Sequence, residues 1–154
     1  MSAKNLHYGM DFCPAFWDWL VHKGNTGSVF SIDKVADEIE AGQDELSDWA
    51  KSRGQALFRR TPPTLAPQFA QVSTWATGQN YTPAAINTFL QAADYFLLAH
   101  ALAGKHTVVT HEVLASSPNR IKIPNACLGL SVRFMTPYQM LRIERARFVL
   151  GAQA

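Results

Sequence analysis

The stretch Thr107-Val-Val-Thr-His-Glu112 decides the fold class, because a short β-branched run leads directly into an acidic residue. Residues 107–110 predict a short buried strand, since they are apolar and β-branched and are bounded by polar segments. In an open α/β sheet, ligands bind at the carboxyl ends of the strands. Glu112 therefore lies where a working acid is expected, although an ordinary loop glutamate would fit the position equally well.

Helical segments and further short strands lie on both sides of this stretch. Helical periodicity, capping residues and first-turn prolines predict helices over residues 14–24, 33–40, 44–52, 68–76, 82–103, 125–130 and 136–147. Short apolar runs predict strands over residues 28–32, 107–110, 121–123 and 132–134. Helices that alternate with short strands are typical of an α/β domain with a parallel sheet covered on both faces. We expect residues 1–154 to form one such domain.

The composition is that of a packed globular protein rather than a disordered chain. Hydrophobic residues make up 47% of the sequence and charged residues 17%. The net charge of +2 is too small to indicate a nucleic-acid partner by itself. The N-terminal segment has no apolar core typical of a signal peptide, and residues 95–103 fall short of the roughly 20 apolar residues that span a bilayer. The sequence therefore predicts a cytoplasmic protein without a membrane partner.

The cysteines, histidines and tryptophans indicate packing rather than chemistry. Cys13 and Cys127 lack the paired spacing of a zinc knuckle or a disulfide framework, and we expect both to be small buried apolar residues. The five histidines form no metal-binding pair at helical spacing, and His100 is expected to be a hydrogen-bonded core residue. The four tryptophans are expected to pack the core rather than stack on bases.

Asp94 is the most unusual acidic residue, because the predicted helix over residues 82–103 places it beside Leu90, Leu97 and Leu98. A lone carboxylate on an apolar helix face costs several kcal/mol unless it is paired or bound to a metal ion. The alternative is a boundary aspartate that reaches water or pairs with an arginine of the last helix.

Glu38 lies on the predicted helix 33–40 between Val35 and Ile39, and a solvated acidic face would explain it equally well. Taken together, Glu38, Asp94 and Glu112 supply carboxylate oxygens from three different elements. Such oxygens are the ligands of Mg²⁺ or Mn²⁺. A site of this kind suits metal-assisted hydrolysis of a phosphodiester.

The order and context of these acids resemble the PIN-domain (PilT N-terminus-like) nucleases. Three segments carry the resemblance to the second, third and fourth acidic motifs of that family: Val35-Ala-Asp-Glu-Ile39, Ala93-Asp-Tyr-Phe-Leu-Leu-Ala99 and Val108-Val-Thr-His-Glu112. Two further segments resemble a little-characterised, toxin-like branch: Cys13-Pro-Ala-Phe-Trp-Asp-Trp-Leu20 and Gly42-Gln-Asp-Glu-Leu-Ser-Asp-Trp-Ala50. Each motif is short, but their joint order covers nearly the whole chain.

This resemblance implies a three-layer α/β domain, in which helices flank a short parallel sheet, with the activity of a Mg²⁺- or Mn²⁺-dependent endoribonuclease. Glu38, Asp94 and Glu112 would be the catalytic residues and would bind the metal directly or through water. Many relatives are toxins of bacterial toxin–antitoxin pairs. The resemblance thus implies an RNA substrate and an antitoxin protein as partners, and it is compatible with a homodimer.

The N-terminal segment departs from the family pattern. PIN domains begin with a central strand that ends in an Asp-x-(Asn/Ser) motif, whereas Ser2-Ala-Lys-Asn5 resembles the segment just after it. Asp11 and Asp18 come too late to replace that acid, so we expect the first strand and first acid to be missing and to lie upstream of Met1. Loss of one ligand predicts impaired or absent nuclease activity. Whether the chain is an enzyme stays open, and the alternative is a non-catalytic PIN-like module that binds RNA or protein.

Overall fold

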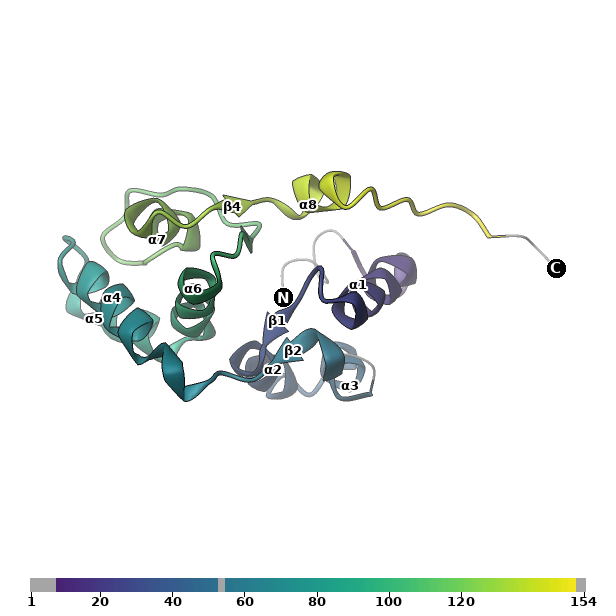
Figure 1. Ribbon diagram of the computed structural model, residues 1–154, viewed down its shortest axis with the longest axis horizontal. Coiled ribbons are helices and arrows are strands. Elements are labelled where there is room, and N and C mark those ends of the chain that lie inside the picture. The colour runs from purple at the N-terminus through teal and green to yellow at the C-terminus, as the bar shows by residue number, and fades with distance from the viewer. Residues whose placement is uncertain (1–7, 53–54, 152–154) are drawn as a thin grey trace.

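The computed structural model describes residues 8–52 and 55–151 (Figure 1). The α-helices are α1 (Pro14–Thr26), α2 (Asp33–Glu40), α3 (Glu45–Ser52), α4 (Ala66–Thr77), α5 (Pro83–Gln91), α6 (Ala93–Gly104), α7 (Ile123–Leu130) and α8 (Pro137–Ile143). The strands are β1 (Ser31–Ile32), β2 (Phe58–Arg59), β3 (Val108–Val109) and β4 (Phe134–Met135), and short 3₁₀ turns cover Gln55–Leu57 and Pro63–Leu65. The segment Ser2-Ala-Lys-Asn5, which resembles the segment just after the first acidic motif of PIN domains, lies outside the described residues.

The strands form two separate parallel pairs. β1 pairs with β2, with Ser31 opposite Phe58, and β3 pairs with β4, with Val108 opposite Phe134. The predicted α/β class with parallel strands is confirmed. The expected single sheet is present, within the described residues, as two two-stranded sheets that do not hydrogen-bond to each other.

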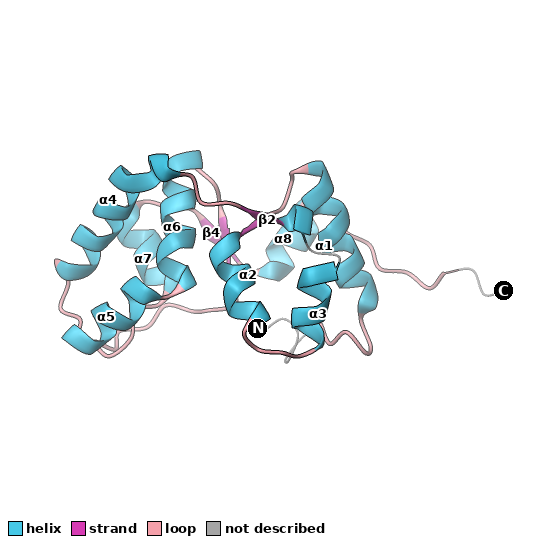
Figure 2. Cartoon of the chain, turned by 90° about the horizontal axis from the view of Figure 1, so that it is seen from below, coloured by secondary structure: helices cyan, strands magenta, loops and turns pink. Residues whose placement is uncertain are grey.

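The molecule has two halves, with the strands between two groups of helices (Figures 1 and 2). We call the part with α1, α2, α3, β1 and β2 the α1 half, and the part with α4, α5, α6, α7, β3 and β4 the α6 half. Helix α6 packs against β1, β3 and α2, and α8 extends from β4 towards the α1 half. These two helices therefore join the halves. Within the described residues, no helix is long and apolar enough to cross a membrane.

The core of the α1 half is aromatic. Its buried residues are Phe16, Trp17, Leu46, Trp49, Ala50 and Leu57. The rings of Trp17 and Trp49 meet edge to face with their centroids 5.1 Å apart, a favourable arrangement for aromatic pairs. The expectation that tryptophans pack the core is thus confirmed for these two residues.

The core of the α6 half is mostly aliphatic. Its buried residues are Val72, Ala76, Phe89, Leu98, Ala101, Val108, Ile121, Ile123, Ala126, Cys127, Leu130 and Val132. Burial raises the pKa of the Cys127 thiol to about 11, as expected for an inert core cysteine. Cys13 is only half-buried, so the prediction of a buried cysteine is confirmed for Cys127 and not for Cys13.

The predicted single helix over residues 82–103 is wrong, because the chain breaks at Ala92. This residue has extended backbone angles (φ −89°, ψ 159°), ends α5 and precedes the first residue of α6. The break creates a new helix N-terminus at Ala93. Asp94 therefore lies in the first turn of α6 and not in the middle of a long helix.

Two other predictions are also wrong, and one strand was missed. Residues 121–123 do not form a strand, because Ile123 begins α7 and Pro124 favours a helix start. The last helix ends at Ile143 rather than near residue 147, and Arg145 then adopts a left-handed conformation (φ 55°). The capping box between Thr136 and Gln139 at the start of α8 is confirmed. Strand β2 was not predicted, since its two residues carry no alternating pattern.

Candidate carboxylate site

Asp94 is half-buried in the first turn of α6, and its environment disfavours the charged carboxylate. The pKa of Asp94 is raised from 3.8 to about 6, first by burial and then by the neighbouring charges of Glu112 and Glu38, in that order. Arg120 and Lys122 act in the opposite direction. The three acids predicted from sequence thus lie close enough to repel one another, although they come from separate elements.

Glu38 joins the two halves at this site. It is an exposed residue near the end of α2, and its Oε1 accepts a hydrogen bond of 2.8 Å from the backbone N–H of Ala93. That N–H is one of the groups at the start of α6 that the helix itself cannot satisfy. The positive end of the helix dipole also favours a carboxylate there. Glu38 therefore caps α6 from across the junction.

Glu112 has a similar role at α7. Its Oε2 accepts a hydrogen bond of 2.8 Å from the backbone N–H of Ile123, and its Oε1 lies 3.4 Å from Nη2 of Arg120. Its own backbone N–H donates to Oγ1 of Thr110 at 3.0 Å, which fixes the turn after β3. The prediction that Glu112 follows a strand is confirmed, although β3 ends at Val109, one residue earlier than expected.

Two basic residues lie beside the acids. Arg120 is largely exposed, with 67% of its side chain accessible, and Lys122 directly precedes the first residue of α7. Both are close enough to stabilise the charged form of Asp94. The predicted alternative partner of Asp94 was an arginine of the last helix, whereas the nearby cations come from the loop before α7.

The donor chemistry of the site suits a hard cation. Within the described residues, no group of three His, Cys, Asp or Glu side chains is close enough to hold a metal ion directly. Mg²⁺ is usually bound through one or two carboxylates and keeps several waters. Glu38 and Glu112 each direct one oxygen to a backbone N–H.

A second polar network, not predicted from sequence, lies farther along α6. The hydroxyl of Thr61 donates to Oδ1 of Asp33 at 2.7 Å, and the backbone N–H of Thr61 donates to Oδ2 at 2.8 Å. Since that hydroxyl proton is used, Nε2 of His100, 3.1 Å from Oγ1, is the donor in the third bond. Burial lowers the pKa of His100. The hydrogen bond expected for His100 is confirmed, but the residue is half-buried and does not belong to the core cluster.

The network also affects Asp33, the first residue of α2. Burial alone would raise its pKa, but the hydrogen bonds from Thr61 and Lys34 and the nearby His100 lower it overall. Asp33 follows β1, Thr61 follows β2, and His100 belongs to α6, so the network connects the two halves. Nothing in the proline-rich loop after Thr61 signals this contact, because its partners are 28 and 39 residues away.

The chain belongs to the family described as a domain of unknown function (DUF4411), whose model matches residues 1–148. No curated protein matches the chain. No solved structure matches it either.

Proposed function

We propose that the carboxylate site belongs to a metal-dependent endoribonuclease of the PIN type. The observation that carries the proposal is the pKa of about 6 for Asp94, caused by burial and by the charges of Glu112 and Glu38. A site in which a half-buried carboxylate is repelled by two neighbouring ones gains stability when a cation neutralises them. Perturbed pKa values of this kind are common at functional sites.

The sequence supports the same proposal through the order of its acidic motifs, which follows the PIN pattern. Parallel strand pairs with helices around them are also compatible with a PIN-like three-layer domain. By this resemblance the protein would be the toxin of a bacterial toxin–antitoxin pair, with RNA as its substrate and an antitoxin protein as its partner.

Each side chain would have a defined task in this reaction. Asp94, Glu112 and Glu38 would hold Mg²⁺ or Mn²⁺, directly or through water. The bound ion would lower the pKa of a water molecule and offset charge on the leaving oxygen. Arg120, which is exposed beside Glu112, would hold the RNA phosphate. Above about pH 6 the Asp94 carboxyl is mostly ionised, which is the form that would bind the cation.

A second function, that of a non-catalytic module that binds RNA or protein, is favoured by a different observation. Glu38 and Glu112 each accept a hydrogen bond from a helix N-terminus, at 2.8 Å in both cases. Such capping stabilises the fold without any metal ion. In this reading the acids shape the junction between the halves, and Arg120 and Lys122 contact a partner.

Cleavage of a single-stranded RNA in the presence of Mn²⁺ separates the two functions. We expect slow, Mn²⁺-dependent cleavage that Asp94→Asn abolishes. Asp37→Asn is the matched control, because Asp37 is an exposed acid next to Glu38. Cleavage that persists in a chelator or in Asp94→Asn contradicts the nuclease assignment. RNA binding without cleavage, unchanged by Mn²⁺, supports the binding module instead.

A further inference from the structure

Residues 144–150, which we call the C-terminal segment, leave the body of the molecule after α8. The segment runs past α1 and away from the helices (Figures 1 and 2). It has the sequence Glu-Arg-Ala-Arg-Phe-Val-Leu, so it begins charged and ends with three apolar residues. All three are exposed: Phe148 by 39%, Val149 by 73% and Leu150 by 94%. Consecutive apolar residues at such exposure are typical of a surface that another molecule covers.

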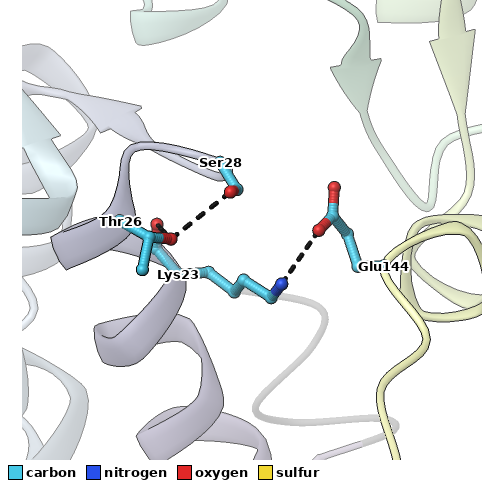
Figure 3. Close-up of polar contacts among 4 residues, drawn as sticks. All are labelled: Lys23, Thr26, Ser28 and Glu144. Atoms are coloured by element: carbon cyan, nitrogen blue, oxygen red, sulfur yellow. Dashed lines mark hydrogen bonds and ion pairs between the residues drawn. The ribbon is translucent and has the colours of Figure 1, made fainter.

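The start of the C-terminal segment is anchored to α1. Oε2 of Glu144 forms an ion pair of 3.0 Å with Nζ of Lys23, in the last turn of that helix (Figure 3). The hydroxyls of Thr26 and Ser28, which are 3.3 Å apart, form a hydrogen bond where α1 ends (Figure 3). Because Lys23 neutralises Glu144, this acid does not compensate the charge of the arginines around it.

Two further contacts fix the path of the C-terminal segment. Arg145 adopts a left-handed conformation (φ 55°) after α8, and the N–H of Ala146 donates to the carbonyl of Leu141 at 2.9 Å. The ring of Phe148 meets that of the buried Phe16 edge to face, with the centroids 6.5 Å apart. The segment is therefore held against the α1 half up to Phe148, while its last two residues stay exposed.

The backbone of this segment has hydrogen-bonding groups to offer. Within the described part of the chain, no backbone hydrogen bond involves an N–H or C=O of residues 147–151. Such a backbone can pair with another strand, as the edge of a sheet does. Phe148 and Val149 also favour strands. In a strand, Arg147 and Val149 would lie on one face and Phe148 and Leu150 on the other, because side chains alternate.

The charge around the segment indicates an acidic protein as the partner. Arg142, Arg145 and Arg147 are exposed, and none of them forms an ion pair with a described residue. Opposite charges across a pair of strands are favourable, whereas like charges are not. A second copy of the same segment would bring the same arginines. RNA would compensate their charge but would gain nothing from the aliphatic side chains of Val149 and Leu150.

We infer that residues 146–150 bind another protein, which pairs with them through an extended segment of alternating acidic and apolar residues. Main-chain hydrogen bonds would hold the partner, as in other cases of strand addition, and the side chains would select its sequence. Carboxylates of the partner would face the arginines, and its apolar residues would cover Val149 and Leu150. The inference does not depend on the proposed nuclease activity, since none of these residues belongs to the carboxylate site.

Titration with a designed peptide tests this inference, by NMR of the full chain in a chelator and without RNA. The probe is the peptide Ser-Glu-Val-Glu-Leu-Glu-Val-Ser, and the shifts of the Val149 and Leu150 amides give its Kd. One control peptide has lysine in place of each glutamate. A second has proline in place of leucine, which removes a donor and disfavours the strand. We expect saturable shifts and slower exchange of the Val149 amide with the first peptide only.

Variants of the full chain separate the apolar and the charged contributions to binding. The double variant Val149→Ser, Leu150→Ser should raise the Kd of the glutamate peptide by about tenfold, because apolar surface is no longer buried. The double variant Arg145→Gln, Arg147→Gln should raise that Kd by about fivefold, because two favourable cross-strand pairs are lost.

The matched control is the double variant Lys51→Gln, Arg60→Gln, which removes two exposed cations, one on α3 and one after β2. It should leave the Kd unchanged. Equal binding of the glutamate and proline peptides, or no saturable binding of the glutamate peptide, overturns the inference.

Three further outcomes would assign the segment differently, and each overturns the inference. A Kd that responds to the arginine variant alone would show ionic attraction without strand pairing. Arginine-dependent binding of a short single-stranded RNA, with no binding of the peptide, would make the segment an RNA contact. Shifts of Val149 that depend on protein concentration in the absence of peptide would assign the segment to contacts between copies of the chain.

Discussion

The two halves of the molecule are stabilised in different ways, although each contains one parallel strand pair. Among the described residues, the α6 half buries a cluster of twelve residues, mainly small and aliphatic, whereas the α1 half buries six, three of them aromatic. The junction between the halves includes polar contacts, through Glu38, through the Asp33–Thr61–His100 network and through the Lys23–Glu144 pair. The rings of Phe30 and His106, whose centroids are 4.8 Å apart, also meet there. Packing therefore shapes each half, whereas directional polar contacts and packing together place one half against the other.

This difference matters because the carboxylate site takes residues from both halves. Asp94 and Glu112 belong to the α6 half, whereas Glu38 comes from α2 of the α1 half. The repulsion that raises the pKa of Asp94 thus depends in part on the relative position of the halves. Changes in either core should alter the free energy of unfolding, whereas a change at Glu38 should also alter the pKa of Asp94.

The largest effect is expected in the core of the α6 half. Leu98→Ala removes a fully buried side chain, and such truncations lower the free energy of unfolding by about 2–5 kcal/mol. Denaturation in urea measures the loss. Leu114→Ala is the control, because Leu114 is 52% exposed and should change stability by less than about 0.5 kcal/mol. Equal losses would contradict the assignment of Leu98 to a packed core.

Asp94→Asn should stabilise the protein at neutral pH. Because the carboxyl pKa is higher in the native state than the ordinary 3.8, the native state binds the proton more tightly than the unfolded chain does. The contribution of Asp94 to the free energy of unfolding therefore rises as the pH falls from about 6 towards 3.8. The substitution should add about 1–2 kcal/mol at pH 7, since solvent screens part of the repulsion.

Thermal unfolding between pH 4 and pH 7 measures this effect. The pH dependence should be weaker in Asp94→Asn than in the wild type. Asp37→Asn should retain the wild-type dependence, because Asp37 is exposed on α2. A lower stability of Asp94→Asn at pH 7 would show that the carboxylate stabilises the native state and would contradict the account of repulsion.

A smaller effect is expected at the junction network. Thr61→Val removes the hydroxyl between Asp33 and His100 and should lower the free energy of unfolding by about 1 kcal/mol. The loss of a donor should also raise the pKa of Asp33, which NMR titration can follow. Thr64→Val, at an exposed position of the following 3₁₀ turn, is the control. An unchanged Asp33 pKa in Thr61→Val would contradict the network.

The elements with strong local signals were predicted from the sequence with good accuracy. Helix α2 has the predicted bounds of 33–40, because amphipathic spacing marks it clearly. The strand before Glu112 and the capping box at Thr136 were also found, since both depend on neighbouring residues. The break at Ala92 left no local signal, because alanine favours helices and no proline or glycine adjoins it.

Contacts between distant residues account for the remaining differences. Glu38 caps α6 across 55 residues of sequence, and the partners of Thr61 are also remote. Neither periodicity nor composition reports such pairs. The proximity of Glu38, Asp94 and Glu112 was predicted through the motif order, and their mutual repulsion is consistent with it. Their roles as metal ligands stay predictions.

Direct binding of Mn²⁺ tests the central claim, that the three carboxylates form a cation site. Electron paramagnetic resonance at pH 7 would give the Kd of Mn²⁺ for the wild type, for Asp94→Asn and for the control Asp37→Asn. We expect Asp94→Asn to raise the Kd about tenfold or more, because a ligand is lost, whereas Asp37→Asn should leave the Kd unchanged. An equal Kd for all three proteins would contradict the claim.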